Sequence, residues 1–240
     1  ALKKIGYSVS TFDPKKKPLN LIDKNKVDII FNALHGRDVE DGVAQSYFEY
    51  LKIPYTHSGV ISSYNAMNKV ISKEFFKRNK IRSPKYFVIN KNDFTKFLMI
   101  KTIKKKRINF PIVVKPTNEG SSIGVRICKN ITILNKFTKS LFNKYSELIF
   151  EPYIGGQEIQ VAVINNFPLG AIELKPKREF YDYKAKYSKS ARTEHIMPAN
   201  LKKIHYKEAL KIAKKAHNAL GCKGVTRSDF KFFNNQFFLL

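Results

Sequence analysis

The chain has 240 residues, of which 43% are hydrophobic, and 45 Lys and Arg against 19 Asp and Glu give a formal net charge of +26. This apolar content is too high for a disordered chain, and no stretch approaches the roughly 20 apolar residues of a membrane span. Two cysteines are too few for a disulfide scaffold, so a cytoplasmic protein of one large or two to three small domains is expected.

The N-terminal half alternates predicted strands with helices. Residues 27–34 (VDIIFNAL) form a continuous apolar run, which is typical of a parallel strand buried on both faces. A helical stripe follows, formed by Met67, Val70, Ile71 and Phe75. The other elements predicted here are helices at 45–51 and 93–103 and strands at 53–55 and 86–89.

Strands predominate after residue 110. Predicted strands lie at 111–115, 124–128, 147–150, 158–164, 169–174, 224–233 and 236–240, with helices at 131–145 and around 206–220. Asn234 and Asn235 predict a hairpin turn, because Asn tolerates a positive φ. The pattern therefore predicts an α/β N-terminal part followed by an α+β part with antiparallel sheet, with boundaries near residues 59 and 151.

A Gly/Ser loop, residues 119–124 (EGSSIG), joins two of these strands. A Walker loop would need Gly-Lys-Ser/Thr and a following helix, and a dinucleotide fingerprint would also need that helix. The loop is therefore either a plain hairpin turn or a hairpin that covers phosphates with its backbone N–H groups, with Lys115 as a nearby point charge.

Glu151 and Glu158 flank residues 152–157 (PYIGGQ), which connect two strands. Such a connector can hold an adenine edge against backbone atoms while a carboxylate reaches a ribose hydroxyl. The alternative is a solvated hinge, since many loops are simply polar.

Three further segments are candidates for chemistry. Residues 181–187 (YDYKAKY) suit a lid over an anionic substrate, a nucleic-acid surface or a solvated loop. Arg227 and Asp229 share a strand face, either as an ordinary salt bridge or as an anion-stabilising Arg beside a metal carboxylate. Residues 35–42 (HGRDVEDG) follow the predicted strand 27–34, as a ligand-binding loop or a capped turn.

The order and spacing of these motifs resemble the D-alanine–D-alanine ligase family of the ATP-grasp superfamily. The matching stretches are FNALHGRDVEDG (31–42), IPYTHSGV (53–60), NAMNK (65–69), PIVVKPTNEGSSIGV (111–125), EPYIGGQE (151–158), FYDYKAKY (180–187), MPA (197–199) and LGCKGVTRSDF (220–230). FYDYKAKY and HGxxxEDG separate this family from other ATP-grasp enzymes.

The resemblance implies an ATP-grasp fold preceded by a partial N-terminal Rossmann-like α/β domain. The expected divisions are a partial substrate domain at 1–58, a central ATP-grasp subdomain at 59–150 and an incomplete C-terminal ATP-grasp subdomain at 151–240. The implied reaction uses ATP to phosphorylate the carboxylate of one D-alanine. The amine of a second D-alanine then attacks the acyl phosphate, giving the dipeptide for peptidoglycan synthesis.

The resemblance also implies roles for particular residues. Those expected to bind ATP are Lys69, Lys115, Lys186, Glu151 at the start of the adenine connector and Glu158 at the ribose. Those expected to act on the substrates are Ser121 and Tyr187, which fasten a lid, Arg227 at the oxyanion, and His35 and Glu40. Asp229 is expected to bind one of two Mg²⁺ or Mn²⁺ ions, and a homodimer is expected.

Two stretches of the family pattern are absent from this sequence. A Gly–Gly–x–Ser–x–Glu stretch is expected before residue 1, and a Glu–x–Asn–Thr–x–Pro–Gly stretch, which carries most of the metal ligands, is expected after residue 240. We therefore expect the chain as it stands to show no substantial ligase activity. A remnant that folds without catalysing stays a competing hypothesis.

Two more hypotheses concern the substrate and the partner. A ligase that takes D-lactate or D-serine would differ around the lid segment, and FYDYKAKY favours D-alanine. A nucleic-acid-binding protein would explain the charge, but 37 Lys against 8 Arg fits drift toward A/T-rich codons better than selection for phosphate recognition. We therefore expect neither a nucleic-acid partner nor a membrane partner.

Overall fold

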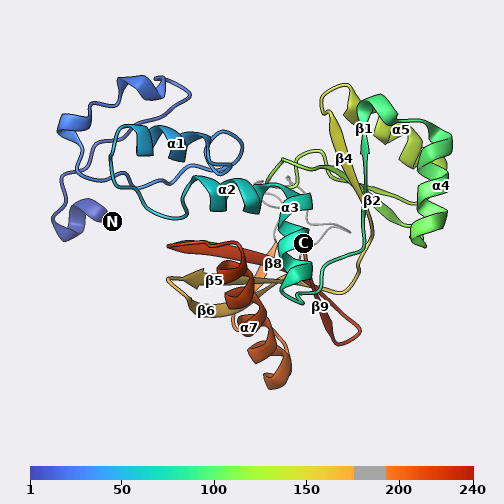
Figure 1. Cartoon of the computed structure of the whole chain (residues 1–240). Helices are drawn as coiled ribbons and strands as arrows, with labels where there is room; N and C mark the ends of the chain where they lie inside the picture. Colours follow the sequence, from blue (N-terminus) through green and yellow to red (C-terminus); the bar gives the residue numbers. More distant parts are fainter. Residues whose placement is uncertain (176–192) are drawn as a thin grey trace.

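Two antiparallel sheets organise the computed structural model, which describes residues 1–175 and 193–240 (Figure 1). Helices and two antiparallel sheets together confirm the predicted mixed fold with antiparallel sheet in its C-terminal part. Within the described ranges, no helix is both long and apolar enough to cross a membrane.

The central sheet has the strand order β1-β4-β2-β3, and each neighbouring pair is antiparallel. Its strands are β1 (Phe87–Asn90), β2 (Ile112–Pro116), β3 (Arg126–Cys128) and β4 (Glu147–Pro152). A short η4 (Lys91–Asp93) precedes α4 (Lys96–Lys106), and α5 (Ile131–Phe142) follows β3. Both α-helices pack on one face, where Ile112, Val114 and Phe150 are fully buried. Because successive side chains of a strand point to opposite faces, the remaining side chains of β2 and β4 lie on the face away from these helices.

The C-terminal sheet has the order β7-β6-β5-β8-β9. Its strands are β5 (Gln157–Ile164), β6 (Phe167–Lys175), β7 (Glu194–Ile196), β8 (Val225–Phe233) and β9 (Gln236–Leu239). The long helix α7 (Lys203–Ala219) covers one face, and the small side chains of Ala209, Ala213 and Ala216 allow close packing. Asn234 and Asn235 adopt φ values of 48° and 56°, which confirms the predicted hairpin turn.

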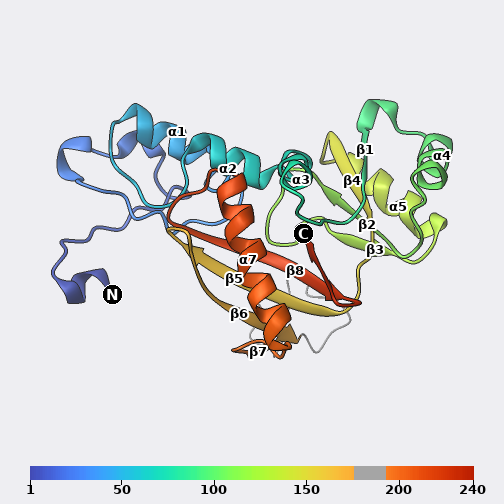
Figure 2. The same ribbon diagram turned by 60° about the horizontal axis from the view of Figure 1, so that its bottom comes forward.

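Helix α3 (Lys69–Arg78) lies between the two sheets (Figures 1 and 2). The prediction of one helical stripe from Met67 to Phe75 is wrong in one respect. Met67 ends α2 (Val60–Met67), whereas the other residues of the stripe lie in α3. Asn68 separates them: its backbone is extended, and its side chain accepts hydrogen bonds from the next turn as the N-cap of α3. Phe76 packs into the C-terminal core, while Lys73 contacts the central sheet.

The N-terminal part differs from the sequence prediction. Residues 27–34 form no strand, and Ile29 and Phe31 are each 56% exposed. Only one parallel bridge, between Ile30 and Tyr55, is present there, because the described residues supply no other neighbour to complete a ladder. The remaining elements of this part are η1 (Leu2–Ile5), η2 (Leu19–Leu21), η3 (Lys24–Lys26) and α1 (Val43–Tyr50). A Rossmann-like N-terminal domain therefore stays a prediction.

Candidate active site

A pair of buried charges marks the face of the central sheet that α4 and α5 leave uncovered. In the antiparallel register Glu151 lies opposite Val113, two residues from Lys115, so the two charged side chains share that face. Lys115 Nζ lies 2.7 Å from Glu151 Oε2. Strand pairing thus brings together two predicted nucleotide-binding residues that are far apart in the sequence.

Helix α3 adds two more lysines to this face. Lys69 begins the helix, and its ammonium group donates to the carbonyl oxygen of Glu119 in the Gly/Ser loop. Lys73 lies one turn later and places its Nζ 2.8 Å from Glu151 Oε1. Two lysines therefore pair with the Glu151 carboxylate, and a third, Lys69, lies near them beside the Gly/Ser loop. The sequence did not point to Lys73.

Burial and charge set the protonation of this cluster. Burial alone would raise the pKa of Glu151, but Lys115 and Lys73 outweigh it and lower that pKa to about 2, so the carboxylate stays ionised. Burial, together with the nearby Lys115, lowers the pKa of Lys69 to about 7. An arriving polyanion such as a triphosphate would therefore favour the charged form of Lys69.

The Gly/Ser loop has an unusual backbone. Ser121, Ser122 and Gly124 have φ values of 51°, 61° and 71°. A Cβ at Gly124 would lie 2.9 Å from two ring carbons of Pro116, so the close return of the chain onto β2 requires glycine. Left-handed residues turn backbone N–H groups toward one side, which suits an anion as well as a tight turn.

The predicted substrate loop lies next to this Gly/Ser loop. His35 Nδ1 lies 3.3 Å from Glu40 Oε1, and the Gly36 backbone N–H donates to Glu40 Oε2 at 2.5 Å. A Cβ at Gly120 would lie 4.0 Å from Glu40 Oε2. The structure thus brings His35 and Glu40 together and places Glu40 beside the loop that carries Ser121.

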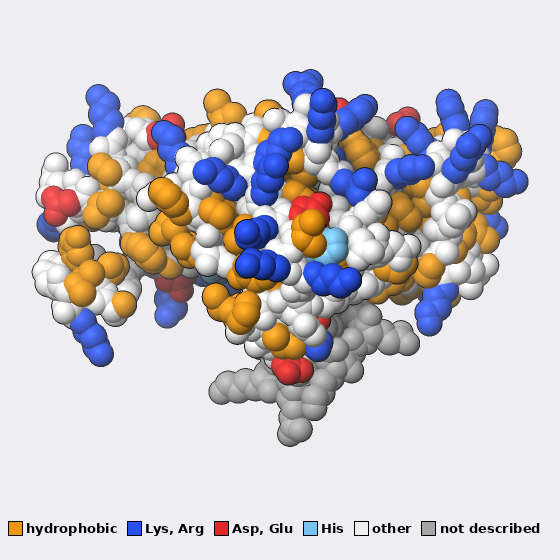
Figure 3. Space-filling view, turned by 90° about the horizontal axis from the view of Figure 1, so that it is seen from below, with side chains coloured by type: hydrophobic (Ala, Val, Ile, Leu, Met, Phe, Trp, Pro, Cys, Tyr) orange, Lys and Arg blue, Asp and Glu red, His pale blue; other side chains and the backbone are white. Residues whose placement is uncertain are grey.

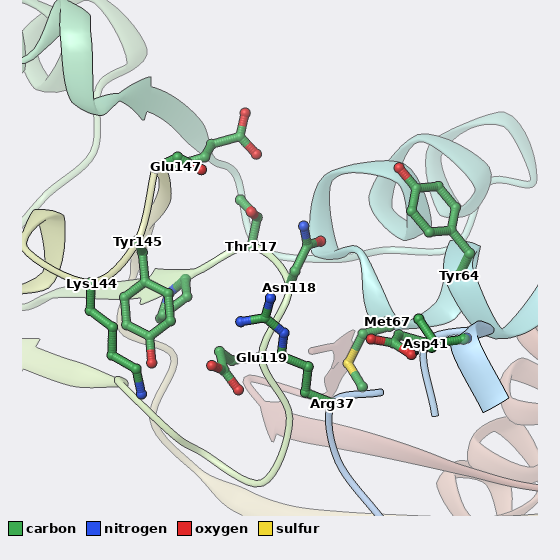
Figure 4. A pocket seen from close by; sticks show the side chains of 13 residues that line it. Arg37, Asp41, Tyr64, Met67, Thr117, Asn118, Glu119, Lys144, Tyr145 and Glu147 are labelled. Atoms are coloured by element: carbon green, nitrogen blue, oxygen red, sulfur yellow. Dashed lines mark hydrogen bonds between the residues drawn. The ribbon is translucent and has the colours of Figure 1, made fainter. Parts of the chain in front are cut away.

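A cavity of about 360 Å³ lies between these two loops and the segment that joins α5 to β4 (Figure 4). Figure 4 shows Arg37 and Asp41 on its substrate-loop side and Lys144 and Tyr145 on the opposite side. Asp41 also accepts a hydrogen bond from the Asp38 backbone N–H at 2.9 Å. Residues 35–42 are therefore both an internally bonded turn and one wall of a polar cavity.

A second polar stripe runs along the face of the C-terminal sheet opposite α7. Glu158 and Lys231 are cross-strand partners, and Glu158 Oε2 lies 3.0 Å from Lys231 Nζ. Arg227 donates to both carboxylate oxygens of Asp229, at 2.8 and 3.1 Å, which confirms that they share a face. Lys231 was missed by the sequence analysis, although its spacing of two from Asp229 places it in the same stripe.

The residues described do not fit a two-metal site. Asp229 offers one carboxylate, already paired with Arg227, and no group of three or more His, Cys, Asp and Glu side chains lies close enough to hold a metal ion in residues 1–175 and 193–240. Lys186 and Tyr187, expected in the lid, lie outside the described residues.

Residues 75–240 match the family model described as the D-Ala D-Ala ligase C-terminus. The chain belongs to the D-alanine–D-alanine ligase family. A D-alanine–D-alanine ligase from Pelagibacter ubique (strain HTCC1062) is 52% identical over 239 residues, which are 100% of this chain and 77% of that protein.

Solved structures of ligases agree with this D-alanine–D-alanine ligase assignment. A Bacillus anthracis D-alanine–D-alanine ligase complexed with ATP superposes with a TM-score of 0.74 at 29% identity, covering 89% of this chain and 67% of that one. A D-Ala:D-Ser ligase from Enterococcus faecalis gives a TM-score of 0.78 at 28% identity, covering 89% and 62%. The shared fold therefore extends across ligases whose names state different second substrates.

Proposed function

We infer that this chain is an ATP-dependent ligase that joins two D-alanines into D-alanyl-D-alanine for peptidoglycan precursor synthesis. The reaction passes through a D-alanyl acyl phosphate, which the amine of the second D-alanine attacks. The observation that carries this function is the ion pair of Lys115 with buried Glu151, with Lys69 bonded to the adjoining Gly/Ser loop, in a chain 52% identical to a D-alanine–D-alanine ligase.

We propose that ATP lies between the two sheets. Lys69 and Lys115 contact its phosphates, residues 151–156 hold the adenine edge by backbone groups, and Glu158 reaches the ribose. Glu158 already has Lys231 as a partner at 3.0 Å, and this ion pair holds the carboxylate in place. Lys186 extends to the γ-phosphate.

We propose that the D-alanines lie between the substrate loop and the Gly/Ser loop. His35 and Glu40 position the first D-alanine, and Arg227 stabilises the oxyanion that forms as the second one attacks. Phosphorylation of a carboxylate concentrates negative charge, so fixed cations supply much of the stabilisation. Ser121 and Tyr187 fasten a lid, which is needed because an acyl phosphate hydrolyses when water enters.

Several finer assignments accompany this proposal. We propose that two divalent ions, Mg²⁺ or Mn²⁺, accompany ATP, for which Asp229 would supply one ligand and residues other than those described would supply the rest. We also propose a homodimer, a cytoplasmic location, and divisions at 1–58, 59–150 and 151–240. Gel filtration with light scattering tests the dimer, and a mass twice that of the chain is expected.

The test of the function follows ADP release by the product of the complete gene. We expect release to depend on D-alanine, and D-alanine to outcompete D-serine and D-lactate as second substrate from pH 6 to pH 9. ADP release that does not respond to D-alanine would exclude ligation. Preferred use of D-serine or D-lactate would keep the ATP chemistry and reject the dipeptide.

A further inference from the structure

Lys73 is the most deeply buried cation of the site, and the reaction proposed above gives it no role. Only 3% of its surface is exposed. A buried ammonium group is costly unless it is paired and hydrogen-bonded, and burial lowers the pKa of Lys73 against the opposing effect of Glu151. A buried lysine on a helix between two sheets therefore calls for an explanation beyond packing.

The contacts of Lys73 point inward, to the protein. Its Nζ lies 2.8 Å from Glu151 Oε1, donates to the Pro84 carbonyl oxygen at 3.1 Å, and lies 5.5 Å from the centre of the Tyr86 ring. A carboxylate, a carbonyl and an aromatic face all favour a cation. With its ammonium group engaged in this way, Lys73 is poorly placed to bind a phosphate directly.

Glu151 connects Lys73 to Lys115. Each lysine takes a different oxygen of the carboxylate, at 2.8 Å for Lys73 and 2.7 Å for Lys115. The two ion pairs, one at each oxygen, hold the carboxylate in place, and its position in turn fixes where the Lys115 ammonium group lies. An ammonium has three N–H donors, and this ion pair uses one of those on Lys115.

We propose that Lys73 is a positioning residue for ATP, which acts through Glu151 to hold Lys115 where it meets the phosphates. This inference rests on the proposed function, because it assumes that Lys115 contacts ATP. Without Lys73, Glu151 Oε1 would lose its cation, the carboxylate could rotate, and both its oxygens would compete for Lys115. Lys115 would then be drawn toward Glu151 and away from the nucleotide.

The test compares Lys73→Met with Lys77→Met, measuring the Kd of ATP by calorimetry. Lys77 is exposed and lies one turn further along the same helix. Each variant therefore removes one positive charge from α3, but only Lys73→Met also removes a contact to Glu151. Lys73→Met should weaken ATP binding about tenfold, within the range measured for members of one ion-pair network. Lys77→Met should leave the Kd unchanged, and the KM for D-alanine should be the same in both variants.

A double variant separates positioning from a purely structural role. If Lys73 acts through Lys115, Lys73→Met adds almost nothing to the loss caused by Lys115→Met. If it only supports the fold, the two losses multiply and the KM for D-alanine rises as well, which would overturn the proposal. Circular dichroism monitors folding, and Lys73→Gln replaces Lys73→Met if the latter does not fold, with the same expectations.

ATP binding by the unmutated protein distinguishes a failure of the proposed function from a failure of the role proposed for Lys73. If the unmutated protein binds no ATP, the proposed function fails. If it binds ATP, but Lys73→Met (or Lys73→Gln) binds as tightly as Lys77→Met, the function stands and the role of Lys73 is refuted.

Discussion

Lys69 illustrates how a single side chain can be adjusted for an anionic ligand. Lys69 as a whole is half-buried, and burial first, then the neighbouring charge of Lys115, lowers its pKa to about 7. Lysine normally titrates near 10.5, so Lys69 is close to half-protonated at neutral pH when no ligand is bound. A phosphate close to Nζ would restore the charge.

Proton uptake on ATP binding follows from this shift. In the free protein Lys69 is mostly neutral at pH 8, and the bound triphosphate raises its pKa, so binding at pH 8 should take up close to one proton. At pH 6 the lysine is already charged, and uptake from this group should be near zero. The Kd of ATP should rise by up to about tenfold per pH unit above 7. Calorimetry in two buffers of different ionisation enthalpy measures the uptake.

Lys69→Arg is the control for this effect. Arginine stays protonated throughout this pH range, so its variant should bind ATP without the uptake. Equal uptake at pH 8 by both proteins would assign the proton to another group and contradict the role given to Lys69.

Among the elements, the strands of the two sheets except β7 were predicted from the sequence, whereas the strand at 27–34 was not borne out. The hairpin at Asn234 and Asn235 depends on the conformational preference of those two residues, and it was predicted correctly. The strand at 27–34 was wrong because a parallel strand needs partners from elsewhere in the chain, and only Tyr55 is available among the residues described.

In the candidate site, individual residues could be identified from motifs, but their contacts could not. Lys115 and Glu151 were each identified by motif, but their ion pair depends on the register of β2 and β4, which the sequence does not reveal. Lys73 was missed because one lysine among 37 gives no signal of burial. Its spacing of four from Lys69 would place both on one side of a helix, and this was the one available clue.

The connector between the two sheets depends on one glycine. Gly156 has a φ of +81°, and a Cβ there would lie 2.2 Å from the Phe232 carbonyl oxygen. Gly156→Ala should therefore lower the free energy of unfolding by about 2 kcal/mol or more, since it combines left-handed strain with a backbone clash. Urea denaturation measures the change.

The neighbouring glycine provides a matched control. A Cβ at Gly155 would meet only the Phe233 ring, at 3.9 Å, which is ordinary van der Waals contact. Gly155→Ala should stay within about 0.5 kcal/mol of the unmutated protein. Equal losses for the two variants would show that the connector does not depend on the conformation of Gly156.

At the scale of the whole molecule, the charge of +26 is mostly unrelated to the site. Figure 3 shows Lys and Arg side chains spread over the visible face instead of gathered in one patch. The lysines of the candidate site differ from these, because Lys73 and Lys115 are buried around Glu151.

Binding to nucleic acid should therefore be weak and non-specific. In a mobility-shift assay at 150 mM salt, we expect duplex DNA and hairpin RNA to bind no more tightly than the roughly 10⁻⁴–10⁻⁶ M typical of non-specific contacts. Saturable binding at nanomolar concentration to one sequence would show instead that the charge serves a nucleic-acid partner.

Ligation of two D-alanines at the expense of ATP fixes the stoichiometry of the products, which can be measured. The product of the complete gene is incubated with ATP and D-alanine, and the products are separated by chiral chromatography and identified by mass spectrometry. We expect equal amounts of ADP, phosphate and D-alanyl-D-alanine, and no ADP when D-alanine is omitted. ADP formed at the same rate without D-alanine, or ADP formed with no dipeptide, would contradict it.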